Sequence, residues 1–299
     1  MVGRWSSRRS RRIARHRDVT LIVHEYDKSA YTSWISECAS GPTPMVVDVL
    51  RELQARRAIG RLHVASPADQ PQSQVAILHV DSTVVPIEYR EFARSFDRCL
   101  NSRVVDISKR GLDVTPVDQG WTGPVIVKSQ LNYRGRPETR HNARARAAGM
   151  PEPFPGATAV ADYEVFDQYS DVPLELREDE RLVVQRFVPE RDADGYAIRH
   201  WIFAGDAGYC KRFVSSEPMV KADNVRWSEP VPVPAAMHRE RSARGFDFGK
   251  FDFVVHGDEV VLFDANKTPG AFPTSTGDTA DRVRSLADGL GDLLNQPDA

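Results

Sequence analysis

The chain has 299 residues, of which 41% are hydrophobic and 27% are charged, and its formal net charge is −2. A chain of this length forms one large domain or two ordinary ones with a core of their own, which excludes peptides and disulfide-dependent miniproteins. The composition is typical of a soluble globular protein, and no run approaches the ~18 uninterrupted apolar residues of a membrane span. We therefore expect no membrane partner.

The basic residues are unevenly distributed. Residues 1–17 hold seven of the chain's 40 basic residues and none of its 42 acidic ones. This run predicts a basic, solvated and disordered arm over residues 1–18; an anchor for nucleic acid, acidic lipid or a partner is the alternative interpretation. Without interleaved aromatics beyond Trp5, the run indicates no specific nucleic-acid binding. Only seven of the 40 basic residues are Lys. Each Lys therefore indicates a position where a compact ammonium suits better than a planar guanidinium.

The three cysteines, Cys38, Cys99 and Cys210, are widely separated, and none forms a CxxC motif. We expect free thiols in a reducing compartment. The segment SRRSRR is followed by polar residues and not by the apolar stretch of an export signal. The sequence therefore predicts a cytoplasmic protein.

The region over residues 19–100 alternates β-branched runs with helical patterns. Its expected elements are the strand Val19–His24, the helix Pro44–Ile59, the strands Arg61–Ala65 and Val75–Val80, and the helix Ile87–Leu100. This order predicts a small α/β domain with a parallel sheet. Asp81 and Thr83 follow a strand at the edge where such sheets bind ligands, which makes them candidates for substrate contact. A turn or a helix cap is an equally good interpretation of Asp81.

From Asn101 onward, short strands are separated by Gly and Pro. The expected strands are Val125–Lys128, Arg181–Val188, Ala197–Ala204, Tyr209–Val214 and the hairpin Lys250–Ala265. A last helix over Thr279–Leu294 carries apolar residues on one face. We expect an α+β domain over residues 101–299.

The hairpin at residues 249–270 is the strongest candidate site. Its two alternating runs meet at Gly257-Asp258, which is typical of a tight turn. With a loop of Gly257–Glu259, Asp252 faces Asp264 and Lys250 faces Asn266, all on one side of the hairpin. The other side would be apolar, made of Phe251, Phe253, Val255, Val261 and Phe263. A two-residue turn would offset this pairing by one position.

Opposed carboxylates repel unless something positive lies between them. Carboxylate and amide oxygens suit Mg²⁺, so this face of the hairpin favours a magnesium site. A surface hairpin with solvated acids is the alternative interpretation.

Two earlier segments have features that suit a nucleotide. Lys128 ends a β-branched strand directly before the Gly- and Arg-bearing loop LNYRGRPE, where it could hold phosphates under a flexible lid. The strand around Gln185–Val188 runs out into Pro189-Glu190, where exposed main-chain groups could pair with an adenine edge. A solvated Lys and an ordinary core strand are the alternatives.

Taken in order, these blocks resemble the ATP-grasp superfamily. That family has a strand ending in Lys before a glycine-rich loop, a hinge strand of the type E/Q-x-F/Y-[ILV], and a late hairpin with [RK]-x-D, [DE]-x-N and a Pro-Gly turn. The corresponding residues here are Lys128, Gln185-Arg186-Phe187-Val188, Lys250-Phe251-Asp252, Asp264-Ala265-Asn266 and Pro269-Gly270. The resemblance covers residues from about 101 to 294. It implies an ATP-grasp core preceded by the small α/β domain that usually accompanies it.

The resemblance implies ATP and Mg²⁺ as cofactors and a role for each matching residue. Lys128 would contact the α- and β-phosphates, and Gln185, Arg186, Phe187 and Val188 would hold adenine. Glu190 and Asp192 are the candidates for the ribose, and either Lys211 or Arg212 matches a cation that faces phosphate. Asp252, Asp264 and Asn266 would bind two Mg²⁺ ions, and Lys250 would lie at the γ-phosphate.

The sequence departs from the family's pattern at three places. Arg103 is the only cation near the position of the first ATP-binding Lys in many members, Ala197 occupies one plausible position of the ribose-contacting acid, and Asp264 stands where Glu is commoner. These departures concern ribose contacts and metal geometry.

The implied activity is that of a carboxylate–amine ligase, which activates a carboxylate as an acyl phosphate and joins it to an amine, with release of ADP and phosphate. The substrates would be a small carboxylate and an amine, and Arg134, Arg136 and Arg199 could bind an anionic one. The alternatives are a small-molecule kinase of the same fold and a non-catalytic nucleotide-binding scaffold. A homodimer is compatible with the sequence.

Overall fold

The computed structural model describes residues 17–37, 41–112, 120–160, 163–272 and 279–296. The predicted basic arm falls outside these ranges except for Arg17 and Asp18, and so does Cys38. The other two cysteines, Cys99 and Cys210, are free thiols. Within the described ranges, no helix is long and apolar enough to cross a membrane.

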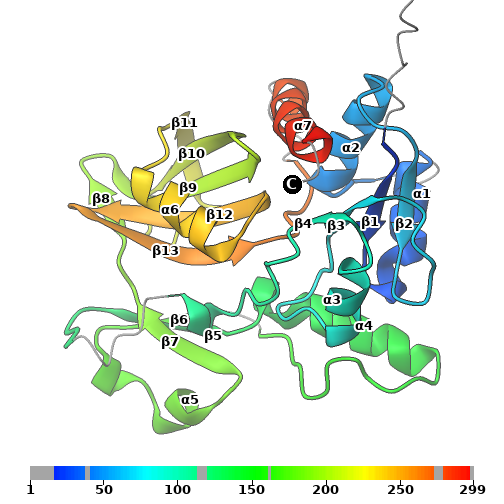
Figure 1. Cartoon of the computed structure of the whole chain (residues 1–299). Coiled ribbons are helices and arrows are strands. Elements are labelled where there is room, and N and C mark those ends of the chain that lie inside the picture. Colours follow the sequence, from blue (N-terminus) through cyan, green and yellow to red (C-terminus); the bar gives the residue numbers. More distant parts are fainter. Residues whose placement is uncertain (1–16, 38–40, 113–119, 161–162, 273–278, 297–299) are drawn as a thin grey trace, which may run out of the picture.

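The described part of the chain up to Leu100, here called the N-terminal unit, contains the parallel sheet that the sequence predicts. Its strands β1 (Val19–Ile22), β2 (Leu62–Ala65), β3 (Val75–Leu78) and β4 (Arg98–Leu100) lie in the order β2-β1-β3-β4, and all neighbouring pairs are parallel. Strands β1 and β3 are buried along their whole length, as expected for the continuous apolar strands of a parallel sheet. Helices α1 (Lys28–Ile35), α2 (Met45–Ala55) and α3 (Ile87–Ala93) pack around it (Figure 1).

The helix expected over Ile87–Leu100 is shorter than predicted. It ends at Ala93, and Arg98–Leu100 forms the edge strand β4 instead. Backbone pairing with β3 satisfies the groups of Arg98, Cys99 and Leu100, so a long-range ladder overrides the local helical pattern.

A three-stranded antiparallel sheet follows, in the order β6-β5-β7. Its strands are β5 (Val125–Ser129), β6 (Glu164–Phe166) and β7 (Leu182–Arg186). The segment expected to be a flexible loop after Lys128 is instead a single 3-10 turn, Asn132–Gly135, that leads into helix α4 (Arg136–Ala147). A short helix α5 (Leu174–Glu178) packs beside β7.

The largest sheet is antiparallel and has six strands. Its order is β11-β10-β9-β12-β13, with β8 on the side of β9. The bounds are Glu190–Asp192 for β8, Gly195–Ala204 for β9, Ala207–Ser215 for β10, Val225–Pro230 for β11, Phe248–His256 for β12 and Glu259–Asn266 for β13. Helix α6 (Ala235–Arg244) contacts β13, and Figure 1 shows the sheet above the three-stranded one.

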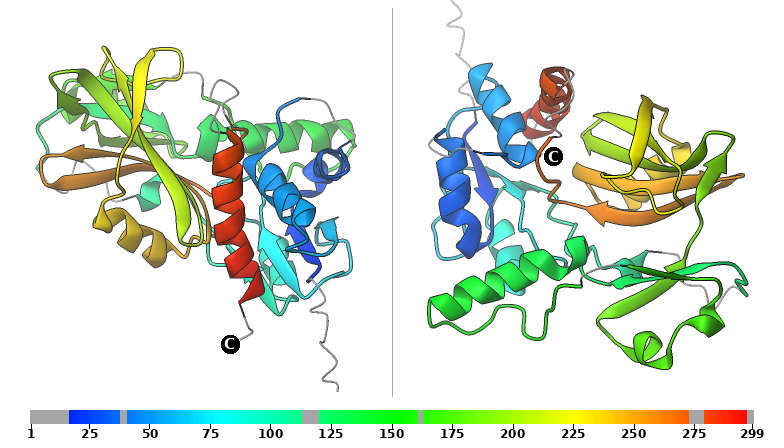
Figure 2. Two further views of the ribbon diagram at one scale, coloured as in Figure 1. Left: turned by 90° about the horizontal axis from the view of Figure 1, so that it is seen from above. Right: turned by 180° about the vertical axis from the view of Figure 1, so that it is seen from behind.

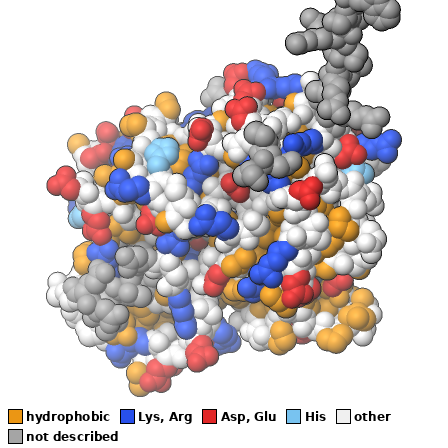
Figure 3. Space-filling view, viewed as in Figure 1, with side chains coloured by type: hydrophobic (Ala, Val, Ile, Leu, Met, Phe, Trp, Pro, Cys, Tyr) orange, Lys and Arg blue, Asp and Glu red, His pale blue; other side chains and the backbone are white. Residues whose placement is uncertain are grey.

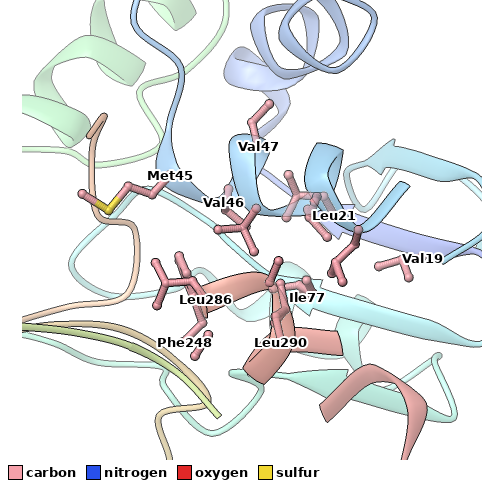
Figure 4. Close-up of a cluster of buried hydrophobic side chains, with 14 of the residues drawn as sticks. Val19, Leu21, Met45, Val46, Val47, Ile77, Phe248, Leu286 and Leu290 are labelled. Atoms are coloured by element: carbon pink, nitrogen blue, oxygen red, sulfur yellow. The ribbon is translucent and has the colours of Figure 1, made fainter. Parts of the chain in front are cut away.

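The last helix, α7 (Thr279–Asn295), returns to the N-terminal unit. Leu286 and Leu290 are fully buried in one cluster with Leu21 and Val46 (Figure 4), and the views in Figure 2 show α7 between the large sheet and α2. Gly289 lets the helix approach the β9–β10 turn, because a Cβ there would lie 2.0 Å from the Ala204 carbonyl oxygen. The N-terminal unit and the last helix thus share one core, which also includes Phe248 of the large sheet.

Candidate active site

The hairpin β12–β13 brings the four predicted polar residues together on one side. Asp252 pairs with Asp264 and Lys250 pairs with Asn266, as the sequence predicts. The turn, however, contains only Gly257 and Asp258, since His256 pairs with Glu259. A bulge restores the expected register.

The bulge lies between Asp252 and Phe253 on one strand and Leu262 and Asp264 on the other, so Phe263 has no partner opposite it. The prediction that Phe263 lies on the core face is confirmed only in part, because Phe263 packs against that core and also lines a cavity. Leu262 is buried in the core, whereas Phe263 is partly buried and lines a cavity.

Two rows of side chains cross the same face of the large sheet. The first joins residues paired in turn across β10, β9, β12 and β13, namely Lys211, His200, Asp252 and Asp264. The second row lies two residues away along each strand and consists of Tyr209, Ile202, Lys250 and Asn266. Cross-strand neighbours on one face lie side by side, so hairpin acids and a Lys from β10 share one surface.

The first of two cavities on this face has a volume of about 260 Å³. It lies between the three-stranded sheet and the large sheet. Its walls are largely apolar, with Ile126, Phe187, Ile198 and Val254 among them. Lys109, Lys128, Asp252 and Asp264 also line it. An apolar slot with a few charged groups is the usual form of a cofactor or small-molecule site.

Two buried lysines face the acids in this cavity. Lys109 Nζ lies 3.1 Å from Asp264 Oδ1 and donates to the Leu131 carbonyl oxygen at 3.0 Å. Burial opposes the charge of Lys109, yet Asp264 raises its pKa. Lys128 Nζ donates to the Phe263 carbonyl oxygen at 3.1 Å. Burial, followed by the charge of Lys109, lowers the pKa of Lys128 to about 7.

The carboxylates of Asp252 and Asp264 suit a metal ion. The Oδ1 atom of each is buried and receives no well-directed hydrogen bond; the ammonium groups of Lys250 and Lys109 lie 2.9 and 3.1 Å from them. Carboxylate oxygens on cross-strand neighbours that accept no hydrogen bond are hard ligands of the kind Mg²⁺ prefers. The Asn266 oxygen already accepts a hydrogen bond from the Thr268 backbone at 2.8 Å. No cluster of three or more His, Cys, Asp or Glu of the metal-binding kind occurs in the described part of the chain.

A second cavity, of about 420 Å³, lies on the other side of Lys250. Its walls come from the large sheet (His200, Lys211 and Lys250), from α4 (Arg140), from α7 (Arg282) and from the N-terminal unit (Asp81). Lys250 forms an ion pair with Asp252, which lines the first cavity, so the two cavities are neighbours. Tyr133 lines both of them.

His200 lies between the two cavities. Its Nε2 is 3.6 Å from Asp252 Oδ1, and its ring is tilted against Phe213 with 4.6 Å between centroids. Burial lowers the pKa of His200 to about 4, against the influence of Asp252, so the ring is neutral at neutral pH.

Of the residues predicted to contact ATP, phosphate or metal, six line neither cavity. Gln185 is buried and donates to the Lys109 carbonyl oxygen at 2.9 Å, Arg186 pairs with Glu259, and the Val188 side chain packs in the core. Glu190 accepts from Arg199 and Arg212, and it also accepts from the Val255 backbone at 2.9 Å. Arg212 also pairs with Asp192 and Glu229, and it lies on the opposite face of β10 from Lys211.

The sequence reasoning missed Lys109, Tyr133 and His200. A signal for Lys109 was present, because Lys is scarce in this chain and five of its seven lysines line the two cavities: Lys109, Lys128 and Lys221 in the first, and Lys211 and Lys250 in the second. A signal for Tyr133 was absent, because its place depends on the turn before α4. On the face in Figure 3, basic and acidic side chains are interspersed.

No protein-family model and no curated protein sequence matches this chain. Among solved structures, it is similar to a RimK domain protein ATP-grasp from Sphaerobacter thermophilus, with 15% identity, coverage of 93% of this chain and 100% of that chain, and a TM-score of 0.48. It is similar to D-alanine–D-alanine ligase from Bacillus anthracis, with 11% identity, coverage of 93% and 96%, and a TM-score of 0.47. It is also similar to the macrocyclase MdnC from Microcystis aeruginosa, bound with precursor peptide MdnA, with 10% identity, coverage of 93% of this chain and 100% of that chain, and a TM-score of 0.46. These values are too low to carry a functional argument, so the residues must carry it.

Proposed function

We propose that this chain is an ATP- and Mg²⁺-dependent ligase of the ATP-grasp type. It would bind ATP in the first cavity, activate a carboxylate as an acyl phosphate, and join it to an amine. One observation carries the proposal: Lys109, Lys128, Asp252 and Asp264 meet in an apolar slot between two sheets, directly beside a second, cation-lined cavity.

The first cavity has the features that a nucleotide needs. Its apolar walls, with Phe187 from the hinge strand among them, suit a planar base. Lys109 and Lys128 offer compact charges to phosphate oxygens. We assign Glu190 and Arg212 to support of the segment that follows the hinge strand, because the two form a buried ion pair there. Gln185, whose amide holds the Lys109 segment, positions that lysine.

Mg²⁺ would be held by Asp252 and Asp264, and by Asn266 if its amide oxygen exchanges the Thr268 hydrogen bond for the ion. When bound, the ion supplies positive charge that neutralises the phosphate oxygens. A bound ion would accept coordination from the Asp252 and Asp264 oxygens that lack a hydrogen bond. It would also reduce the electrostatic repulsion between the two carboxylates.

The protein's own residues then account for the transfer. Lys109 and Lys128 hold the phosphates, and Lys250, between the cavities, faces the γ-phosphoryl group as it passes to the substrate carboxylate. The bond from phosphorus to the ADP oxygen breaks as a bond to the carboxylate oxygen forms. The amine nitrogen next attacks the acyl carbon, inorganic phosphate leaves, and the amine proton goes to solvent. Lys211, in the same row as Asp252, lies where the departing phosphate would develop charge.

The test is an ADP-release assay with Mg²⁺ and ATP over a panel of carboxylates, each with and without a panel of amines. A carboxylate labelled with ¹⁸O should deliver one label to the released phosphate, because the phosphate leaves with an oxygen of the acyl group. Lys128→Met should lose ATP binding, whereas Lys28→Met, on α1 and paired with Asp69, should keep it. Phosphate retained on a hydroxyl acceptor would identify a kinase instead, and a wild-type chain that binds no ATP would overturn the proposal.

A further inference from the structure

Asp81 lines the second cavity, whereas its position in the sequence is equally compatible with a turn or a helix cap. It follows β3 in the N-terminal unit and lines the cavity together with residues of the large sheet. Among the described residues that line this cavity it is the one carboxylate, and Arg140, Lys211, Lys250 and Arg282 are the cations.

Asp81 is held firmly while keeping acceptor capacity. Its Oδ2 accepts from Arg140 at 3.0 Å and its Oδ1 accepts from the Thr268 hydroxyl at 2.9 Å. Arg140 is shared, since it also donates to Asp27 at 3.1 Å. A carboxylate has about four acceptor sites, so these two bonds leave room for an ammonium group that approaches from the cavity.

The sheet wall of the cavity offers the opposite charge. Lys211 forms no ion pair with any described carboxylate. Lys250 forms an ion pair with Asp252, which lines the neighbouring first cavity. The wall formed by the N-terminal unit thus carries the carboxylate of Asp81, which is paired with Arg140 through one oxygen, and the sheet wall carries the ammonium groups of Lys211 and Lys250. A ligand that spans the two walls would match them with an ammonium at one end and a carboxylate at the other.

We propose that the second cavity binds the acid substrate as a zwitterion of the amino-acid class, with its ammonium at Asp81 and its reacting carboxylate at Lys211 and Lys250. The assignment rests on the proposed function, since the carboxylate then lies beside Asp252 at the end of the nucleotide cavity. Thr268 and Arg140 are positioning residues that orient Asp81. The charged groups select for the ammonium and carboxylate of the substrate. The substrate's side chain would contact Met45, Ile202 and Phe213, which also line the cavity.

The test compares pairs of probes that differ only at the amine. A panel of free amino acids, L and D, is measured beside the N-acetyl derivative of each, in the presence of Mg²⁺ and a non-hydrolysable ATP analogue. Binding is followed by calorimetry, and ADP release with ATP is measured in parallel. For the preferred pair, the wild-type chain should bind the free amino acid roughly ten- to hundredfold more tightly than its acetylated form.

Asp81→Asn should remove this preference by weakening binding of the free amino acid, while binding of the acetylated form stays within about twofold. Glu88→Gln, on the exposed face of α3, is the matched control and should behave as wild type. Thr268→Val should lower the preference in part. Thermal unfolding of each variant separates a change in selectivity from a loss of fold.

Equal binding of both members of every pair by the wild-type chain would overturn the proposal, and so would an Asp81→Asn variant that retains the preference or weakens both members alike. Failure of every amino acid to bind would overturn it as well. In each case, binding of the ATP analogue in the same samples would leave the nucleotide site standing, whereas its absence would overturn the proposed function itself.

Discussion

Two buried charged regions of this molecule differ in how completely their charges are paired. Around Asp27, at the joint between α4 and the N-terminal unit, the carboxylate accepts from Arg144 at 2.6 Å, from Arg140 at 3.1 Å and pairs with His141 at 2.8 Å. Despite burial, His141 and the two arginines hold the pKa of Asp27 well below its usual range. His24 stacks on His141 with 3.8 Å between ring centroids, and burial lowers its pKa to about 3, so it adds no charge.

The polar part of the first cavity has the opposite character. Lys128 is buried beside Lys109 and has a lowered pKa. The cross-strand neighbours Asp252 and Asp264 each have one ammonium beside a buried oxygen that accepts no well-directed hydrogen bond. The same residue types therefore form a fully paired cluster in one region and an incompletely hydrogen-bonded one in the other. Buried charges without full pairing cost stability, and proteins retain such arrangements chiefly where a ligand relieves them.

The largest effect should come from Asp252→Asn. We expect ADP formation to fall about a thousandfold, because the metal and the row of charges lose a carboxylate. The free energy of unfolding should stay the same or rise, since the repulsion with Asp264 disappears and Lys250, whose side chain is 24% exposed, can regain water when it loses Asp252. Steady-state kinetics and urea unfolding measure the two quantities. Asp258→Asn, at the exposed hairpin turn, is the control, and a strong loss of stability in Asp252→Asn would break the contrast between the regions.

Asp27→Asn should give the reverse result. Arg140 and Arg144 are 41% and 42% exposed in their side chains and can regain water, so the expected loss of stability is moderate, about 2–3 kcal/mol. The ATP analogue should bind the folded variant as it binds wild type, because no member of the cluster around Asp27 except Arg140 lines either cavity. Urea unfolding and calorimetry give the two numbers. A stable variant with a lost nucleotide site would contradict this assignment.

The sequence predicts the hairpin well and the lysines less well, for physical reasons. Alternation with period two is local, so the Asp252–Asp264 pairing follows from it. The bulge that preserves the pairing is accompanied by long-range contacts of Phe263 with Lys128, which a local pattern does not contain. Lys109 lies on a short 3-10 turn whose place is set by long-range bonds to Gln185 and Asp264. No local pattern contains that information.

Helix α4 was missed because its buried face is polar. Its sequence has no large apolar residue, and the side chains it buries include Glu138, His141 and Asn142. Hydrophobic periodicity cannot reveal a helix that packs through hydrogen bonds and ion pairs. The first helix α1 and strand β11 were likewise not predicted, and β11 is exposed along most of its length.

The lowered pKa of Lys128 predicts how nucleotide binding depends on pH. The free site loses the Lys128 proton near pH 7, whereas bound phosphates favour the charged form, so binding takes up a proton above that pH. Affinity for the ATP analogue should fall by up to about tenfold per pH unit between roughly pH 7 and 9. Calorimetry in buffers of different ionisation enthalpy would detect the proton.

The same lysine also affects stability, with the sign fixed by linkage. Its folded pKa lies below the unfolded value of about 10.4, so the unfolded chain holds more protons and stability without ligand rises as pH increases from about 7 to 10. Lys267 adds to this slope, because burial lowers its pKa to about 8. Proton uptake on binding therefore isolates Lys128 better than unfolding does. A pH-independent affinity in the wild-type chain would show that Lys128 does not meet the phosphates.

The smallest expected effect concerns Tyr133, whose ring lines both cavities although 61% of the residue is exposed. Its backbone has φ 45° and ψ 42°, and Arg134 and Gly135 follow at φ 61° and 75°, an unfavourable run for non-glycine residues. The Arg136 guanidinium lies 5.1 Å from the ring, and its Nη1 donates to the hydroxyl at 3.4 Å. A strained turn that presents an exposed ring between two cavities suits a side chain that keeps water from the activated substrate.

Tyr133→Ala should therefore uncouple the reaction, so that phosphate release exceeds formation of the joined product by about threefold while the ATP analogue still binds. Tyr133→Phe keeps the ring and should keep the coupling, which separates shielding from the hydroxyl bond to Arg136. The ratio of phosphate to product is the measurement. If it stays at the wild-type value in Tyr133→Ala, the ring does not shield the acyl phosphate, and the strain at residues 133–135 serves only to start α4. A raised ratio would instead place the strain, like the incompletely hydrogen-bonded carboxylates beside it, among the features that this region keeps for its ligand.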